Sequence, residues 1–226
     1  MKQASIIHPF FWLWLPLLGI VAQIVIEITV PRELKVPMHT EGGPHETLQE
    51  LCLIVAFILC LMTLVKINWS TQKWLGIWVG IAAVCCFYVG GEEVSWGQHI
   101  VNWTTPEFWS HYNDQNETNL HNTSSWLDQK PRAILLAGII VGGLIIPALR
   151  KWKPSLLPTK FSAIYPSGYV VVTALCVLLP YLIQNIYNAL TGQNLFERVS
   201  EVQEFYMYFF VALYLFELRK TVISQV

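Results

Sequence analysis

Charged residues are scarce in this sequence. Asp, Glu, Lys and Arg make up 13% of its 226 residues, whereas hydrophobic residues make up 54%. An ordinary soluble domain carries about 25% charged residues, so this composition excludes a soluble globular domain. No basic run is present, which leaves nucleic-acid binding without support. The net charge of −1 indicates no partner of either sign.

The sequence also lacks cysteine pairs with the spacing of a zinc motif or a disulfide framework. Its five cysteines all lie in apolar runs: Cys52, Cys60, Cys85, Cys86 and Cys176. Thiols in such runs are typical of buried, inert side chains. We therefore expect packing roles for these residues.

Long apolar runs are what the sequence does contain. A membrane-spanning helix needs about 20 predominantly apolar residues. Six runs meet this need and predict spans at about 9–30, 46–67, 73–90, 131–149, 165–190 and 194–218. The predicted fold is an all-α, polytopic membrane protein in which residues 1–226 form a single integral membrane domain. The first run continues beyond any small-residue cleavage site, which favours a retained helix over a signal peptide.

A short helix lying on the membrane surface is predicted between the third and fourth spans. Thr105 and Pro106 are typical of a helix start, with Thr105 as the cap and Pro106 in the first position. Phe108, Trp109 and Tyr112 follow and would dip into the membrane.

The basic residues predict the orientation. Nine of the 14 Lys and Arg residues fall on the side that carries both termini, and an excess of basic residues belongs in the cytoplasm. Both termini are therefore predicted to be cytoplasmic. Of the 15 acidic residues, 14 fall on the outer side or at the outer ends of helices. Acidic residues contribute little to topology, so either function or a solvated rim has to explain them.

Adjacent carboxylates end the third span. If the helix continues past Glu92 and Glu93, then Glu92, Trp96 and His99 share one face, and Glu93 points about 100° away. Glu117 and His121 follow at another i, i+4 spacing. Carboxylates and imidazoles at helical spacing are suited to holding metal ions and transferable protons.

The last span opens with three acids at helical spacing, Glu197, Glu201 and Glu204. Acids in a first helical turn complement the helix dipole, which explains Glu46 and Glu197 without a function. Glu92 and Glu93 end a helix, where the dipole disfavours anions. Like Glu27 at the end of the first span, they need a partner: a cation, a shared proton, or Arg32 and Arg198 from the same side.

Less specific roles remain open for several residues. His99 could hydrogen-bond to a backbone carbonyl. Ser95 could be a nucleophile beside His99, but no GxSxG or SxxK motif surrounds it, and a helix cap or a backbone hydrogen bond is the favoured role. Trp96 and Trp103 are most simply interfacial anchors.

Two motifs, GEEVSWGQ at 91–98 and NETNLHN at 116–122, resemble the signature of an uncharacterised family of bacterial multi-pass inner-membrane proteins. The resemblance implies location in the bacterial inner (plasma) membrane but no activity. In architecture the chain is loosely similar to membrane hydrolases of the alkaline ceramidase type, which hold zinc with histidines. Their serine, aspartate and paired-histidine motifs are not present here.

The first functional hypothesis is a metal-dependent membrane hydrolase or transferase acting on a lipid or lipid-linked substrate at the outer face. All-oxygen ligation would suit Mg or Mn, whereas histidine ligands favour Zn or Fe. The predicted catalytic residues are Glu92, Glu93, His99, Glu117 and His121. The predicted metal ligands are Glu92, Glu93, His121, Glu201 and Glu204.

Two alternatives belong to other classes. One is a transporter or channel subunit coupled to protons or divalent cations. Its weakness is that the fourth and fifth spans carry no ionisable residue at mid-membrane, where a permeation path usually needs one. The other is a structural or assembly protein with an acidic external face.

Overall fold

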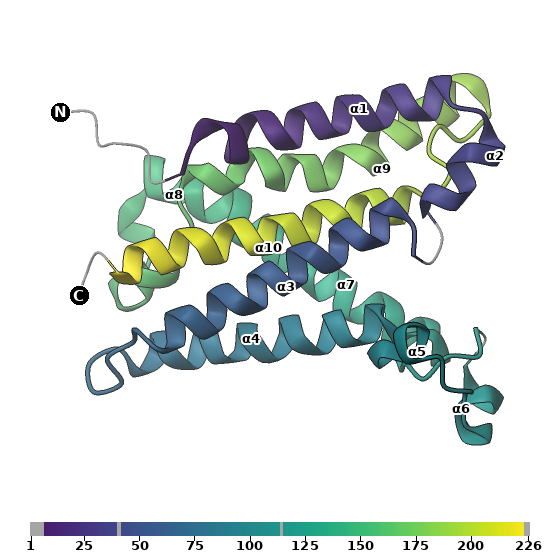
Figure 1. Cartoon of the computed structure of the whole chain (residues 1–226). Helices are drawn as coiled ribbons and strands as arrows, with labels where there is room; N and C mark the ends of the chain where they lie inside the picture. The colour runs from purple at the N-terminus through teal and green to yellow at the C-terminus, as the bar shows by residue number, and fades with distance from the viewer. Residues whose placement is uncertain (1–6, 40–41, 114, 224–226) are drawn as a thin grey trace.

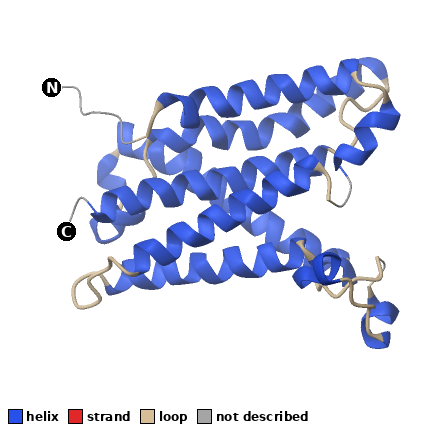
Figure 2. Cartoon of the chain, in the orientation of Figure 1, coloured by secondary structure: helices blue, strands red, loops and turns tan. Residues whose placement is uncertain are grey.

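The computed structural model describes residues 7–39, 42–113 and 115–223. Every regular element in this part of the chain is a helix (Figure 2). This confirms the predicted all-α class. Five helical segments are long and apolar enough to cross a membrane: Phe10–Thr29, Arg32–Leu64, Lys73–Glu93, Gln129–Trp152 and Gly168–Thr191.

Within the described residues, six long helical rods form the bundle. Their bounds are η1 Phe10–Trp14 with α1 Leu15–Thr29, α3 Pro44–Leu64, α4 Lys73–Glu93, α7 Ser125–Ile140 with η5 Val141–Ile145 and α8 Ile146–Trp152, α9 Val171–Thr191, and α10 Val199–Ile223. Short helices fill the connections. They are α2 Arg32–Lys35, η2 Val36–His39, η3 Ser95–Gly97, α5 Gln98–Val101, α6 Glu107–Tyr112, η4 His121–Thr123, η6 Pro154–Leu156, η7 Thr159–Ile164 and η8 Gly168–Val170.

The last rod, α10, is the centre of the bundle. It packs against α3 and α9, while α4 packs on α3 and α1 packs on α9 (Figure 1). Its side chains Tyr206 and Met207 are fully buried in one core cluster, and Leu215 is buried in a second cluster shared with α3 and α4. Because its neighbours shield it, α10 tolerates more polar residues than the five apolar spans.

One of the three glycines of the fourth rod permits the close helix contact that the sequence predicts. A Cβ on Gly143 would lie 2.5 Å from the Cβ of Ala174 in α9 and 2.7 Å from the ring of Phe210 in α10. Gly142 has ordinary clearance, and Gly138 faces open space. Close packing therefore depends on Gly143.

Several helix boundaries differ from prediction. The fourth rod begins at Ser125, because Ser124 caps it, and Pro131 lies inside the helix instead of starting it. Helix α10 begins at Val199, so Glu197 precedes the helix and does not share a helical face with the later acids. Helix α6 forms at the predicted place, but Pro106 is its cap residue and not its first residue.

The two ends of the bundle differ in character. The beginning of η1 and the end of α10 lie at one end, while α5 and α6 project from the opposite end (Figure 1). Helix α4 reaches Glu93 at that opposite end, three residues further than predicted. The acidic residues of α3, α4 and α10 therefore meet beside the connection from α4 to α7.

Candidate functional site: an acidic cavity at one end of the bundle

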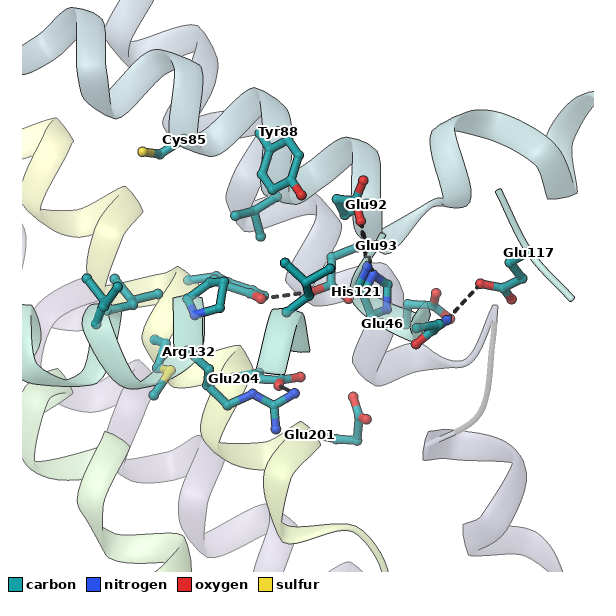
Figure 3. A pocket seen from close by; sticks show the side chains of 18 of the residues that line it. Glu46, Cys85, Tyr88, Glu92, Glu93, Glu117, His121, Arg132, Glu201 and Glu204 are labelled. Carbon is teal, nitrogen blue, oxygen red and sulfur yellow. Dashed lines mark hydrogen bonds and ion pairs between the residues drawn. The ribbon is translucent and has the colours of Figure 1, made fainter. Parts of the chain in front are cut away.

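A cavity of about 650 Å³ opens between α3, α4, α7 and α10. Part of its wall is apolar and includes Val89, Ile134, Leu135 and Met207. The rest is strongly charged and is shown in Figure 3. Its charged and imidazole side chains are Glu46, Glu92, Glu93, Glu117, Glu201, Glu204, Arg132, Arg198, His39 and His121.

The cavity brings together the predicted site residues of three segments. Glu92 and Glu93 come from α4, Glu117 and His121 from the connection to α7, and Glu201 and Glu204 from α10. The remaining predicted catalytic residue is His99. Its backbone belongs to α5, but its side chain lies outside the described residues.

Glu92 anchors the connection to the end of α4. Its Oε2 accepts hydrogen bonds from the backbone N–H of Leu120 at 2.6 Å and of His121 at 2.9 Å, and its Oε1 accepts one from the indole N–H of Trp96 at 2.8 Å. His121 Nδ1 lies 3.6 Å from the same carboxylate. The carboxylate is 4% exposed. An anion at a helix end needs a partner, and for Glu92 the partners are mainly backbone and indole N–H groups.

The predicted continuous helical face of Glu92, Trp96 and His99 is wrong. The helix ends at Glu93, and both Ser95 and Trp96 adopt positive φ values, 46° and 56°. That left-handed turn folds the indole back over the last turn of α4. A Cβ on Gly91 would lie within 2.7 Å of the ring, so the turn requires glycine at this position.

Glu117 lies at the centre of a second polar network. Its Oε2 accepts hydrogen bonds from the Ser95 hydroxyl at 2.6 Å, from Asn119 Nδ2 at 2.5 Å and from Asn122 Nδ2 at 3.1 Å. Residues 117–120 form no helix, so Glu117 and His121 are not an i, i+4 helical pair. Ser95 is buried and held by this carboxylate, which favours the structural role over the nucleophilic one.

A third set of hydrogen bonds closes the connection around Gln98. Its Oε1 accepts from both the backbone N–H and the hydroxyl of Thr118, each at 2.8 Å, and its Nε2 donates to the Thr105 hydroxyl at 2.7 Å. Thr105 in turn donates to the Asn116 carbonyl. Thr105 therefore ties the two arms of the connection together, and it does not cap α6.

Glu93 faces a different neighbour from Glu92, as the sequence predicts. Its Oε1 accepts a hydrogen bond from the Tyr208 hydroxyl of α10 at 2.8 Å. Glu46 of α3 lies within electrostatic range of both Glu93 and Glu201. Three helices thus direct carboxylates toward one region of the cavity (Figure 3).

Sequence reasoning missed two residues of the site, Arg132 and Tyr208. The Arg132 guanidinium forms an ion pair with Glu204, which places α7 against α10. The sequence predicts Pro131 as the helix start and Arg132 at its outer end, whereas α7 begins at Ser125 and includes Arg132 in its helical wall. A tyrosine four residues after Glu204, on the same face of α10, was the available signal for Tyr208.

Glu201 is held by Gln49 of α3 and by Arg198, which immediately precedes α10. Its Oε2 accepts a hydrogen bond from Gln49 Nε2 at 3.2 Å, and its Oε1 lies 3.9 Å from Arg198. Within the described part of the chain, neither Arg198 nor Arg32 forms an ion pair with the glutamates at the ends of α1 and α4. Arg32 forms an ion pair with Glu197 at 2.9 Å.

Glu27 has its own partners at the end of α1. Its Oε2 lies 3.1 Å from Lys35 Nζ, and its Oε1 lies 3.3 Å from His39 Nε2 and accepts from Gln23 Nε2 at 3.0 Å. The His39 ring stacks on that of His45 with centroids 4.3 Å apart. The required cation is therefore supplied locally, by Lys35.

The donor set decides which residues could hold a metal ion. Glu92 and Glu117 each accept three hydrogen bonds, and Glu204 is paired with Arg132. Glu46, Glu93 and Glu201, one on each of three helices, are less occupied. Within the described residues their side chains accept one hydrogen bond each, from Gly42, Tyr208 and Gln49 respectively. Within the described part of the chain, no three His, Cys, Asp or Glu side chains stand close enough together to form a ligand set as placed.

Comparison with known proteins returns no match from family models, curated proteins or solved structures.

Proposed function

We propose that the chain is a membrane-embedded hydrolase or transferase that acts on a lipid or lipid-linked substrate in the acidic cavity. The observation that carries this proposal is the division of the cavity wall. One part is apolar and continues the spanning surfaces of α4 and α7, and the other part gathers six carboxylates and two guanidinium groups. An amphiphile fits such a cavity, with its chain against the apolar part and its reacting head group among the charges.

The geometry supports different roles for the carboxylates. Glu92 and Glu117 position the connection, since their oxygens are used by N–H and hydroxyl donors. Glu93 is the proposed general base. It is half-buried, it lines the cavity, and Tyr208 orients it by donating to Oε1. A positioned base contributes about 10²–10⁴-fold to the rate.

A divalent metal ion (Zn, Mg or Mn) stays part of the proposal. Glu46, Glu93 and Glu201 would hold it after adjustment of their side chains, and carboxylate oxygens suit Mg or Mn best. Such an ion, when bound, would polarise a carbonyl or phosphoryl oxygen. Bringing three carboxylates from three helices together without a cation costs repulsion, which supports this assignment.

We further propose six membrane spans, with α10 as the sixth, both termini in the cytoplasm, and the cavity at the outer face of a bacterial inner membrane. The nine basic residues on the terminal side support this orientation. Single cysteines replacing exposed Ser110 and Ser155 in a cysteine-free background test it. Label should reach Ser110→Cys in intact cells and fail to reach Ser155→Cys, and the opposite pattern would reverse the orientation.

The functional test uses purified full-length protein in nanodiscs of mixed bacterial phospholipids, with Mg, Mn or Zn added. Lipid products are measured by mass spectrometry, and melting is measured with and without chelator. We expect Glu93→Gln to lower turnover by at least about 10²-fold. Glu50→Gln, on α3 but outside the cavity lining, is the matched control.

Metal binding is tested in the same samples. An ion at 100 times its Kd adds about 2.7 kcal/mol to the free energy of unfolding by mass action. If neither chelator nor added ions change the melting temperature of the wild type, the metal is removed from the proposal. If Glu93→Gln leaves product formation unchanged, Glu93 is not the general base.

A further inference from the structure

A second cavity, of about 390 Å³, lies between α1 and α3 on the far side of α10 from α4. Residues 15–23 of α1, 45–52 of α3 and 202–209 of α10 line it. Val202 and Tyr206 form its buried floor, whereas Leu48 and Leu51 at its rim are 45% and 54% exposed. This groove is open toward the surroundings of the bundle, and none of the proposed catalytic residues contacts it.

The groove is mainly apolar along its length, and its amide and imidazole side chains lie at one end; the Tyr206 hydroxyl in its floor donates to the Pro16 carbonyl. Gln23 and His45 lie at the end nearest the acidic cavity, and the opposite end is lined by Leu15, Cys52 and Phe209. The eight steps along α1 from Leu15 to Gln23, at 1.5 Å each, give a length of about 12 Å. One leaflet of a bilayer supplies about 15 Å of hydrocarbon depth. The groove therefore matches one leaflet in both depth and polarity.

The length decides between the two apolar occupants that a membrane offers. A spanning helix of another polypeptide runs through about 30 Å of hydrocarbon, more than twice the length of the groove. An acyl chain enters from one leaflet and covers about half of that depth. We propose that the groove binds one acyl chain of a membrane lipid, with the ester end beside Gln23 and His45.

The charges at the polar end indicate what the site does not select. Gln23 donates a hydrogen bond to Glu27, which pairs with Lys35. Arg32 pairs with Glu197. Both of these cations are thus already paired with a carboxylate. The site therefore recognises the chain and not the charge of the head group, so zwitterionic and anionic lipids bind alike.

The preference for a bound chain over bulk lipid comes from packing. Lipid tails are as apolar as the groove, so burial of apolar surface gives no net gain. An unfilled groove, however, leaves its lining without contacts, and each lost contact costs dispersion energy. A chain seated there also fills the space between α1 and α3, and thereby fixes α1 on the bundle.

Native mass spectrometry tests the proposal on full-length protein in nanodiscs of phosphatidylethanolamine and phosphatidylglycerol in equal amounts. We expect the wild type to retain one lipid of either class in the groove, in addition to any lipid held in the acidic cavity. Cys52→Phe fills the groove from α3 and should retain one lipid fewer than the wild type. Val84→Phe adds the same ring on the exposed face of α4 and should retain as many lipids as the wild type.

Photocrosslinking keeps the test independent of variants that fold poorly. Wild-type protein is reconstituted with a phospholipid that carries a diazirine on its acyl chain, and labelled residues are mapped. Dilution with unreactive lipid should reduce labelling at Leu51 and Phe209 less than at Val84. Equal reduction, a lipid count in Cys52→Phe equal to that of the wild type, or crosslinks from the groove to a second polypeptide would each overturn the acyl-chain site.

Discussion

Replacing Glu92 by Gln tests whether this carboxylate holds the connection between α4 and α7. Three hydrogen bonds converge on it, from Trp96 and from the backbone N–H groups of Leu120 and His121. Glutamine keeps one oxygen for the two backbone donors, but its amide nitrogen opposes the indole N–H. The two retained bonds also lose their charge assistance.

The magnitude follows from these contacts. A hydrogen bond to a charged group contributes about 1.5–3 kcal/mol and a neutral one about 0.5–1.5 kcal/mol, so each retained bond weakens by about 1 kcal/mol. The indole side chain is 41% exposed, and solvent recovers part of the third bond. In total, Glu92→Gln should lower the free energy of opening of the connection by about 2–3 kcal/mol. This corresponds to a roughly 30- to 140-fold increase in the opening equilibrium constant.

Amide hydrogen exchange measures this opening directly. Exchange in a peptide covering 118–124 should accelerate by that factor in Glu92→Gln, while exchange in α9 stays unchanged. Glu107→Gln, at an exposed position of the same connection, provides the matched control. Acceleration below about threefold, less than roughly 0.7 kcal/mol, would refute the anchoring role.

Three further predictions use single side chains. Gly91→Ala places a methyl group against the indole ring and should cost about 1–3 kcal/mol in a chemical unfolding assay, whereas Gly90→Ala, with ordinary clearance, should be neutral or stabilising. Gly143→Ala should cost at least as much as Gly91→Ala by the same assay, because the new methyl group meets a packed helix interface. The Arg32 guanidinium lowers the pKa of Glu197 below its usual 4.5, so this pair stabilises the fold above that pH, and the contribution is lost as the pH falls below it. Melting curves of Glu197→Gln and wild type should therefore converge in acid.

Hydropathy was sufficient to predict the all-α class and most of the long helices. Apolar runs predicted the five segments that are long and apolar enough to cross a membrane, because a run of about 20 apolar residues has few alternatives to a spanning helix. Helix α10 also forms a long rod, but its role as a sixth span stays a prediction. The acids of α3, α4 and α10 meet at one end of the bundle, as predicted, because up-and-down connections place alternate helix ends on one side. Glu46, Glu93 and Glu201 share the cavity for this reason.

Helix ends and distant partners could not be predicted. Helical periodicity predicts Glu92 and Trp96 on one face of a continuing helix. The positive φ values of Ser95 and Trp96 show that the helix ends before them. Such a turn depends on contacts made elsewhere: Ser95 is held by Glu117, 22 residues away. The partner of Glu93, Tyr208, is 115 residues away in the chain. Local spacing contains no information about either contact.

The adjacent glutamates of α4 illustrate how one sequence feature acquires two roles. Consecutive helical residues point about 100° apart, so Glu92 faces the connection and Glu93 faces α10. Each oxygen of Glu92 accepts a hydrogen bond, so the negative charge of this residue has a structural role. Glu93 accepts from Tyr208 through Oε1, and its Oε2 accepts no hydrogen bond from the described residues. A carboxylate in a cavity with one oxygen available can take a proton or ligate an ion, and the neighbouring carboxylate cannot do so without releasing the connection it holds.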